Sequence, residues 1–170
     1  MHFLIIFFLS FFSTHSISQV QDLDTEYKFK RYELVLSSVS WDQARSAAQA
    51  AGGDLLVISS EGENSHIYTW LNSQLSFIRN TTSGVTNGGG AIYVWLGASD
   101  KDEEGTWKWV NDVEFYSGNG STGSAVSNQY NKWGSGPLGS EPDNNGMGGQ
   151  DYGAMGLEAW PTSRASGQGI

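Results

Sequence analysis

Residues 92–110, Ile-Tyr-Val-Trp-Leu-Gly-Ala-Ser-Asp-Lys-Asp-Glu-Glu-Gly-Thr-Trp-Lys-Trp-Val, carry the clearest signal of fold in this sequence. The run from Ile92 to Leu96 is dense in β-branched and aromatic residues, which predicts a central strand. Trp107-Lys108-Trp109-Val110 predicts a second strand. Between the two strands lies an acidic turn, so this stretch combines a core hairpin with a cluster of carboxylates.

Two amphipathic helices are predicted upstream of this hairpin. Ser40 and Gln43 form a capping-box pattern before the first helix, and Gly52-Gly53 ends it. Ser60 and Glu63 repeat the pattern before the second helix. Apolar residues follow at helical spacing in both segments: they are Trp41, Ala44, Ala48 and Ala51 in the first helix, and Ile67, Trp70 and Leu71 in the second.

The remaining segments indicate strands and long loops. Residues 27–36 and the apolar residues at 55–58 predict extended segments. Residues 81–90 and 117–131 are rich in Gly, Ser, Thr and Asn, so we expect loops without regular structure. The predicted fold class is α+β, with two helices packed on small antiparallel sheets with long loops. We expect one core that buries Trp41, Leu55, Ile58, Trp70, Trp95, Leu96, Trp107 and Trp109.

Composition limits the possible functions. The chain has 170 residues, which suits one domain, and 18 Asp and Glu against 9 Lys and Arg. This acidity disfavours nucleic acid as a partner, because phosphate binding depends on clustered basic charge. Cysteine is absent, so disulfides cannot stabilise the domain. His66 is the one histidine beyond the N-terminal segment, which leaves few candidate bases for a catalytic triad and nearly excludes a zinc site.

The N-terminal segment predicts export. Residues 4–12 are almost purely apolar, and Ser16-Ile17-Ser18 precedes a plausible cleavage point, so residues 1–18 read as a signal peptide. The run is too short for a membrane span, which needs roughly 20 residues. The alternative is a buried N-terminal strand. We expect a linker at 19–26, a domain at 27–170, and a secreted protein that is extracellular, or periplasmic if the source is bacterial.

A second acidic cluster lies in a glycine-rich loop near the C-terminus. Calcium takes six to eight oxygen ligands from carboxylates, amides and carbonyls. Both acidic segments offer such oxygens and contain no histidine. The alternative is that these residues are solvated loop residues favoured by turn chemistry. The acidic and amide residues are Asp100, Asp102, Glu103 and Glu104 in the first cluster, and Glu141, Asp143, Asn144, Asn145, Gln150 and Asp151 in the second.

Three segments together resemble the C-type lectin family, over about residues 27–160. The first is the helical block from Trp41 to Leu71. The second, Trp95-Leu96-Gly97-Ala98 with the acidic turn and Trp107-x-Trp109, is similar to the core strand and calcium-loop residues of that family. The third, Glu141-Pro142-Asp143-Asn144 followed by Gly148-Gly149-Gln150-Asp151, is similar to its Glu-Pro-Asn sugar-binding loop.

The resemblance implies a calcium-dependent carbohydrate-binding module. Asp100, Glu104, Asn144 and Asp151 would converge on one calcium ion. Glu141, Gln150 and either Asp143 or Asn144 would bind a second calcium ion and the glycan hydroxyls. The chain departs from the family pattern at several positions. Ala48 and Tyr152 stand where the family has cysteines, Asp143 replaces an asparagine, and the Trp-Asn-Asp segment with the closing strand that pairs near Tyr32–Leu36 is absent.

This absence predicts a C-terminally incomplete domain, a fragment, with one edge unpaired and an incomplete sugar-binding calcium site. Two other functions compete with the lectin hypothesis. One is a metal-independent module of the same fold that binds a protein ligand in adhesion. The other is a glycosidase that uses carboxylates alone. No acid/base pair stands out in the sequence, so we expect a protein that is not an enzyme.

Overall fold

The computed structural model describes residues 2–8, 30–81, 84, 90–136, 139–144 and 149–158. It has the α+β architecture that the sequence predicts. The predicted linker at 19–26 and the segment at 162–170 lie outside the described residues. Among the described helices, none is both long enough and apolar enough to cross a bilayer.

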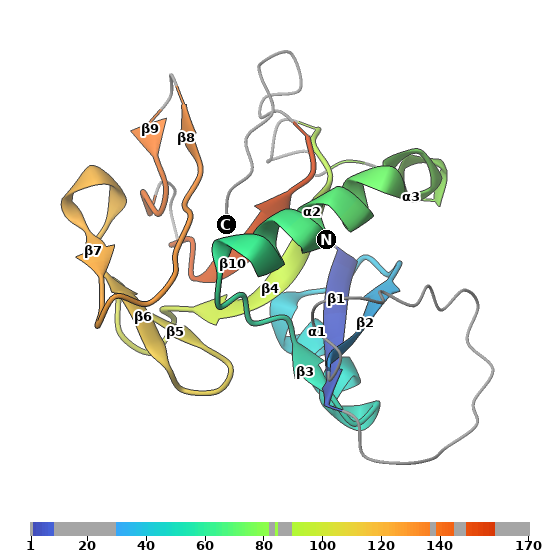
Figure 1. Ribbon diagram of the computed structural model, residues 1–170, viewed down its shortest axis with the longest axis horizontal. Helices are drawn as coiled ribbons and strands as arrows, with labels where there is room; N and C mark the ends of the chain where they lie inside the picture. Colours follow the sequence, from blue (N-terminus) through green and yellow to red (C-terminus); the bar gives the residue numbers. More distant parts are fainter. Residues whose placement is uncertain are drawn as a thin grey trace.

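The main sheet is built around β4 (Tyr93–Ser99), the strand predicted from the Ile92–Leu96 run. Its strands follow the order β2-β1-β4-β5-β6-β7, with β10 also paired to β4 and β3 paired to β1 (Figure 1). Every pair is antiparallel except β1 with β4. The other strands of this sheet are β1 (His2–Phe8), β2 (Lys30–Val35), β3 (Asp54–Leu55), β5 (Thr106–Trp109), β6 (Glu114–Ser117), β7 (Ser124–Ala125) and β10 (Tyr152–Gly156).

Both predicted helices are present, and a third follows them. The helix α1 (Trp41–Ala50) begins after Ser40, and the predicted capping box with Gln43 is formed. The helix α2 (Glu61–Ser73) begins after Ser60. The expectation of two helices was incomplete, because α3 (Leu75–Thr81) continues beyond α2. Only Ile78 of α3 is fully buried, so this short helix gave a weak periodic signal in the sequence.

The N-terminal apolar segment lies in the sheet as β1. It pairs with β2 from Phe3↔Val35 to Phe8↔Lys30 and with β4 at His2↔Val94 and Phe3↔Trp95. This arrangement is the alternative that the sequence left open. In the chain that retains residues 2–8, β1 pairs with β2 where a closing strand was expected, so the expectation that β2 lacks this partner is corrected for that chain. Cleavage after residue 18 concerns processing and stays a prediction.

The segment between residues 117 and 131 was expected to lack regular structure, and this prediction was wrong. It contains a 3₁₀ turn, η2 (Gly120–Thr122), and the short strand β7, which pairs with β6 at Tyr116↔Ala125 and Ser117↔Ser124. Downstream, β8 (Ser135–Gly136) and β9 (Gly139–Ser140) form a separate hairpin. These elements lie at the end of the molecule opposite to α3 (Figure 1). Two-residue strands are too short to leave a periodic signal in the sequence.

The helix α1 is held against the sheet by aromatic side chains and a glycine. The Trp41 indole N–H donates to the Leu96 carbonyl oxygen at 2.7 Å, and Trp41 stacks on Tyr152 with ring centroids 4.9 Å apart. A Cβ at Gly97 would lie 2.8 Å from Val110 Cγ2 and 3.0 Å from the Leu55 carbonyl oxygen. Only glycine allows the β3 segment to approach β4 this closely.

A second aromatic group fills the core under β5 and β6. Trp109 stacks on Phe115 with centroids 4.4 Å apart, and Trp133 packs edge-on against Trp107 at 4.8 Å and Tyr116 at 5.5 Å. Of the eight residues expected in one core, six are buried, and Trp70 and Trp95 are partly buried and pack against the core. The expectation of a single core was wrong, because Trp41 and Leu55 form a second cluster with Ala44 and Ala48, against which Trp95 packs.

A buried carboxylate ties β2 to α2. The side chain of Glu63 is fully buried and accepts hydrogen bonds from Lys30 Nζ at 2.7 Å, Tyr32 Oη at 2.9 Å and the Ser59 amide at 2.9 Å. Burial raises the pKa of Glu63, but the hydrogen bonds from Lys30 and Ser59 outweigh burial and leave the pKa below its ordinary value. The sequence pattern assigned this carboxylate to a capping box; instead it joins two elements distant in the chain.

We predict that Glu63→Ala lowers the free energy of unfolding by about 3 kcal/mol, because it leaves buried donors without an acceptor. The carboxylate has a lowered pKa in the folded state, so its contribution is present above the ordinary value of 4.5 and is lost as the pH falls through the folded-state pKa. Urea unfolding of wild type and variant at neutral and acidic pH measures both effects.

The matched control is Glu61→Ala in the first turn of the same helix. Glu61 accepts from Lys132 Nζ at 2.8 Å, but its side chain is 59% exposed, so its loss should have little effect. Equal destabilisation by the two substitutions would contradict the role given to Glu63.

Candidate functional site

The two acidic loops meet at the end of β4. The first is the turn at residues 100–105, directly after this strand, and the second ends at Asp151, directly before β10. The Asp100 amide donates to the Asp151 carbonyl oxygen at 3.2 Å, and Tyr152 pairs with Ser99. Backbone pairing of β4 with β10 therefore brings together two loops about fifty residues apart in the sequence.

Asp100 is the most enclosed carboxylate of the site. It is only 4% exposed, and its Oδ2 accepts from the Gly105 amide at 3.0 Å. Its Oδ1 is buried and has no hydrogen-bond partner in the described structure. Burial raises the pKa of Asp100, and the nearby charges of Glu104 and Asp151 raise it further. A buried anion with an unused oxygen beside other anions favours a cation as its partner.

The second loop is held by its own backbone and by η2. The Asp143 amide donates to Glu141 Oε2 at 3.1 Å, and the Gly120 amide donates to the Pro142 carbonyl oxygen at 2.6 Å. Asn144 has a positive φ of 51°. Its Oδ1 accepts from the Gln150 amide at 3.0 Å. The loop residues 145–148 lie outside the described residues.

A glycine lets this loop close on Asp151. Gly149 has φ 83°, and a Cβ at this position would lie 2.3 Å from Asp151 Oδ1 and 3.5 Å from Asn144 Oδ1. Both the Asn144 amide oxygen and the Asp151 carboxylate therefore lie close to Gly149, and a side chain at this position would clash with Asp151 Oδ1.

The predicted site residues thus form two groups. Asp100, Glu104 and Asp151 interact electrostatically at the end of β4, and Asn144 lies beside Asp151 through Gly149. Glu141 and Asp143 lie at the start of the second loop, where burial raises the pKa of Glu141 and the charge of Asp143 adds to the effect. The side chains of Asp143 and Gln150 are exposed.

The donor chemistry of the first group fits a hard cation, although its side chains are not gathered around one position. All of its side-chain donors are oxygens, and the unpartnered Oδ1 of Asp100 is suited to a metal ligand. Within the described residues, no three His, Cys, Asp or Glu side chains are already gathered as a metal site. Asp100 and Asp151 with the Asn144 amide would be the residues that hold calcium, with Glu104 completing the set.

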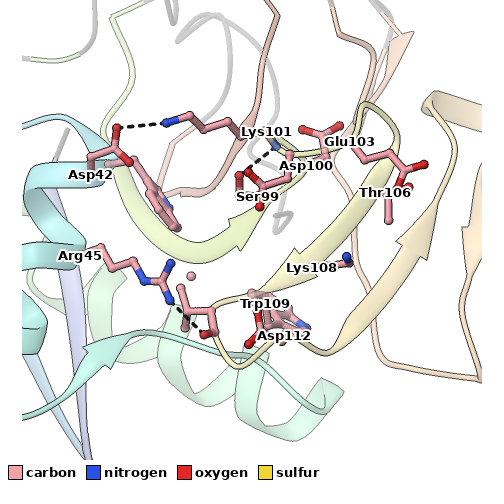
Figure 2. Close-up of a pocket in the computed structure, with 14 residues that line it drawn as sticks. Asp42, Arg45, Ser99, Asp100, Lys101, Glu103, Thr106, Lys108, Trp109 and Asp112 are labelled. Carbon is pink, nitrogen blue, oxygen red and sulfur yellow. Dashed lines mark hydrogen bonds and ion pairs between the residues drawn. The ribbon is translucent and has the colours of Figure 1, made fainter.

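A pocket of mixed charge, which no sequence motif indicated, adjoins the turn at Asp100. It has a volume of about 260 Å³ and lies between α1 and the hairpin of β4 and β5. Figure 2 shows the Asp42–Lys101 ion pair on one side of the pocket and Arg45 on another. The ion pair is 3.5 Å long, and Arg45 donates to the Val110 carbonyl oxygen at 3.1 Å. Its charged residues come from α1, from the acidic turn and from β5 and the residues after it, and no motif indicated that these segments enclose a pocket.

Together, the three helices, the mainly antiparallel sheet and the paired acidic loops define an α+β ligand-binding domain of the C-type-lectin-like class. The chain belongs to the C-type lectin domain family: residues 37–152 match the Lectin C-type domain. The resemblance and the fold class inferred from the sequence are confirmed. Members of this family bind carbohydrate or protein ligands.

Three similar proteins illustrate the range of this family. Halomucin of Haloquadratum walsbyi is 30% identical over 118 residues, which cover 66% of this chain and 1% of halomucin. The human secretory phospholipase A2 receptor is 36% identical over 75 residues, which cover 44% of this chain and 4% of the receptor. C-type lectin domain family 4 member M of Nomascus concolor is 29% identical over 116 residues, which cover 68% of this chain and 21% of that protein.

The chain therefore spans at most about a fifth of these relatives, which carry much else besides the shared domain. Their names describe a mucin, a receptor and a lectin-domain protein. No solved structure gives a significant match to the chain.

We predict that Asp100→Asn raises the melting temperature of the metal-free protein at neutral pH. The pKa of Asp100 is raised in the folded state, so its ionised form opposes folding, and stability falls as the pH rises through that pKa. Asparagine keeps an acceptor for the Gly105 amide and removes the charge. Melting in EDTA from pH 4 to pH 8 measures the effect, and a lower melting temperature of the variant throughout this range would contradict it.

Proposed function

We propose that this protein is a secreted, calcium-dependent carbohydrate-binding module. The observation that carries the proposal is the buried carboxylate of Asp100, whose Oδ1 has no partner and which lies beside Glu104 and Asp151 in a domain of the C-type lectin family. C-type lectin domains are generally calcium-binding. A cation at this position would satisfy the unused oxygen and reduce the repulsion among the carboxylates.

Two groups of residues would hold calcium under this proposal. Asp100, Glu104, Asn144 and Asp151 form the first group, and its role is to fix the second loop to the end of β4. The second group is formed by Glu141, Gln150 and either Asp143 or Asn144. Bound calcium there supplies coordination positions for two sugar hydroxyls.

The side chains of the second group would orient the sugar. The Glu141 carboxylate accepts hydrogen bonds from sugar hydroxyls, and the amide of Gln150 or Asn144 donates through its NH₂ while its oxygen faces the metal. Asp143, when ionised, can only accept. The contact between the Asp143 amide and Glu141 Oε2 at 3.1 Å holds the Glu141 carboxylate over the start of the loop. Such fixed acceptors are what discriminate among hydroxyl arrangements.

A second candidate function is metal-independent binding of a protein. The mixed-charge pocket at Asp42, Arg45 and Lys101 favours it, because both signs of charge lie around one concave surface, as suits a charged peptide segment. This face lies beside the Asp100 turn, so a single domain could carry both activities. Catalysis is not expected, since the names of the relatives describe a mucin, a receptor and a lectin-domain protein.

Calcium dependence has a direct test. We predict that calcium raises the melting temperature of the full chain, and that calcium retains the chain on mannose or galactose resin whereas EDTA releases it. Glu141→Ala should weaken retention about tenfold or more through the loss of one charged ligand. The control is Asp102→Asn, because Asp102 is exposed in the first acidic turn and is not a proposed ligand. Retention that is equal in calcium and EDTA would favour the protein-binding alternative.

Secretion has a separate test. We predict that the chain expressed with residues 1–18 appears in the medium with Gln19 as its first residue, because the apolar run at 4–12 suits a leader. Mass spectrometry of the secreted protein identifies its N-terminus. Recovery of a folded protein that retains His2–Phe8 would instead establish β1 as a permanent strand between β2 and β4.

A further inference from the structure

A second pocket is lined by Glu141, at the start of the second acidic loop. It has a volume of about 390 Å³ and is open to solvent, with β6, η2 and β7 on one side and the β8–β9 hairpin on the other. These elements form one end of the molecule (Figure 1). The size falls within the range of small-ligand sites, which begins at roughly 300 Å³.

The pocket has a rigid aromatic base. Trp133 lines it and packs on Trp107, Phe115 and Tyr116, with centroids 4.8 to 5.9 Å apart. The Tyr116 hydroxyl donates to the Gly120 carbonyl oxygen at 2.8 Å, and this bond holds η2 beside the Tyr116 side chain. An aromatic surface held on several sides is suited to the apolar face of a ligand and costs little entropy on binding.

The polar atoms of the pocket suit hydroxyl groups. The hydroxyls of Ser124, Ser135 and Ser140 line it and can both donate and accept. The indole N–H of Trp133 is buried and has no partner in the described structure. Among the described residues that line the pocket there is no Lys or Arg, which disfavours phosphate, sulfate and carboxylate ligands.

Glu141 connects this pocket to the proposed sugar-binding loop. Its side chain lines the pocket, and its amide donates to the Gly134 carbonyl oxygen at 2.8 Å, which ties it to the segment that carries Trp133. A carboxylate has about four acceptor positions, and the Asp143 amide uses one at Glu141 Oε2. Glu141 can therefore accept from hydroxyls on the pocket side as well as on the loop side.

We propose that this pocket is a second saccharide subsite, which holds a neutral sugar residue linked to the residue bound at the loop of Glu141. The domain would then recognise a disaccharide or longer glycan in preference to a single sugar. The inference rests on the proposed function, because Glu141 belongs to both sites. Trp133 supplies the surface for the ring, and the serine hydroxyls and Glu141 bind its hydroxyl groups.

The test is isothermal titration calorimetry of the full chain, in calcium and in EDTA, with mannose, galactose, mannobiose and lactose. We expect at least one disaccharide to bind about tenfold more tightly than its monosaccharide, the equivalent of one or two net hydrogen bonds. Ser124→Trp and Ser135→Trp fill the pocket from exposed positions on its two sides, so both variants should fold. Ser76→Trp, an equally exposed serine in α3, is the matched control.

The disaccharide gain is the ratio by which the disaccharide binds more tightly than its monosaccharide. The proposal is supported if both filling variants lose this gain and keep the monosaccharide Kd, while Ser76→Trp keeps both. It is overturned if the gain persists in both filled pockets. Monosaccharide binding in calcium without any disaccharide gain overturns the subsite and leaves the proposed function intact. If a disaccharide binds equally well in calcium and in EDTA, and filling the pocket abolishes this binding, the result supports the subsite and contradicts calcium dependence. No binding of any of the four sugars overturns both.

Discussion

The close contact between Gly97 and the β3 segment is the constraint on which the rest of the molecule depends. The Gly97 amide donates to the Leu56 carbonyl oxygen at 2.8 Å, and its carbonyl oxygen accepts from the Val110 amide at 2.7 Å. A side chain at this position would separate the strands. Since the chain has no cysteine, the helix layer is joined to β4 only by such non-covalent contacts. The indole of Trp41, bound to the Leu96 carbonyl oxygen, completes this junction.

The position of the acidic loops follows from this junction, because both loops leave the sheet beside β4. Asp100 comes directly after β4, and Asp151 comes directly before β10, its antiparallel neighbour. Their separation is therefore set by backbone ladders, which a change in a loop side chain cannot shift. The sheet forces carboxylates together that would repel each other in free solution. Because the backbone holds these carboxylates close together, a bound cation would relieve their repulsion. This arrangement does not require strain in any single residue.

Sequence patterns predicted the features that are local in the chain. Ser40 with Gln43 specified the start of α1, and the apolar run around Trp95 specified β4, because each signal lies within a few residues of the element it describes. Glu63 shows where such reasoning fails. Its spacing from Ser60 matched a capping box, yet its carboxylate accepts from Lys30 and Tyr32, which are more than thirty residues away. The two pockets could not be predicted from local patterns either, since they arise from contacts between distant segments, and only the family resemblance suggested that Asp100 and Asp151 meet.

Asp100 and Glu141 are both partly desolvated carboxylates, but their surroundings suit different ligands. Burial raises the pKa of both carboxyl groups, and a neighbouring acidic residue adds to the effect in each case. Their surroundings differ, however. Asp100 is 4% exposed and its unused oxygen is buried, whereas Glu141 lines an open pocket with hydroxyl-bearing neighbours. A poorly solvated carboxylate in a closed site is best satisfied by a cation, and one in an open polar pocket is equally served by donor hydroxyls. Both groups oppose folding while unliganded, so under the proposed function each bound ligand would also stabilise the loop that holds it.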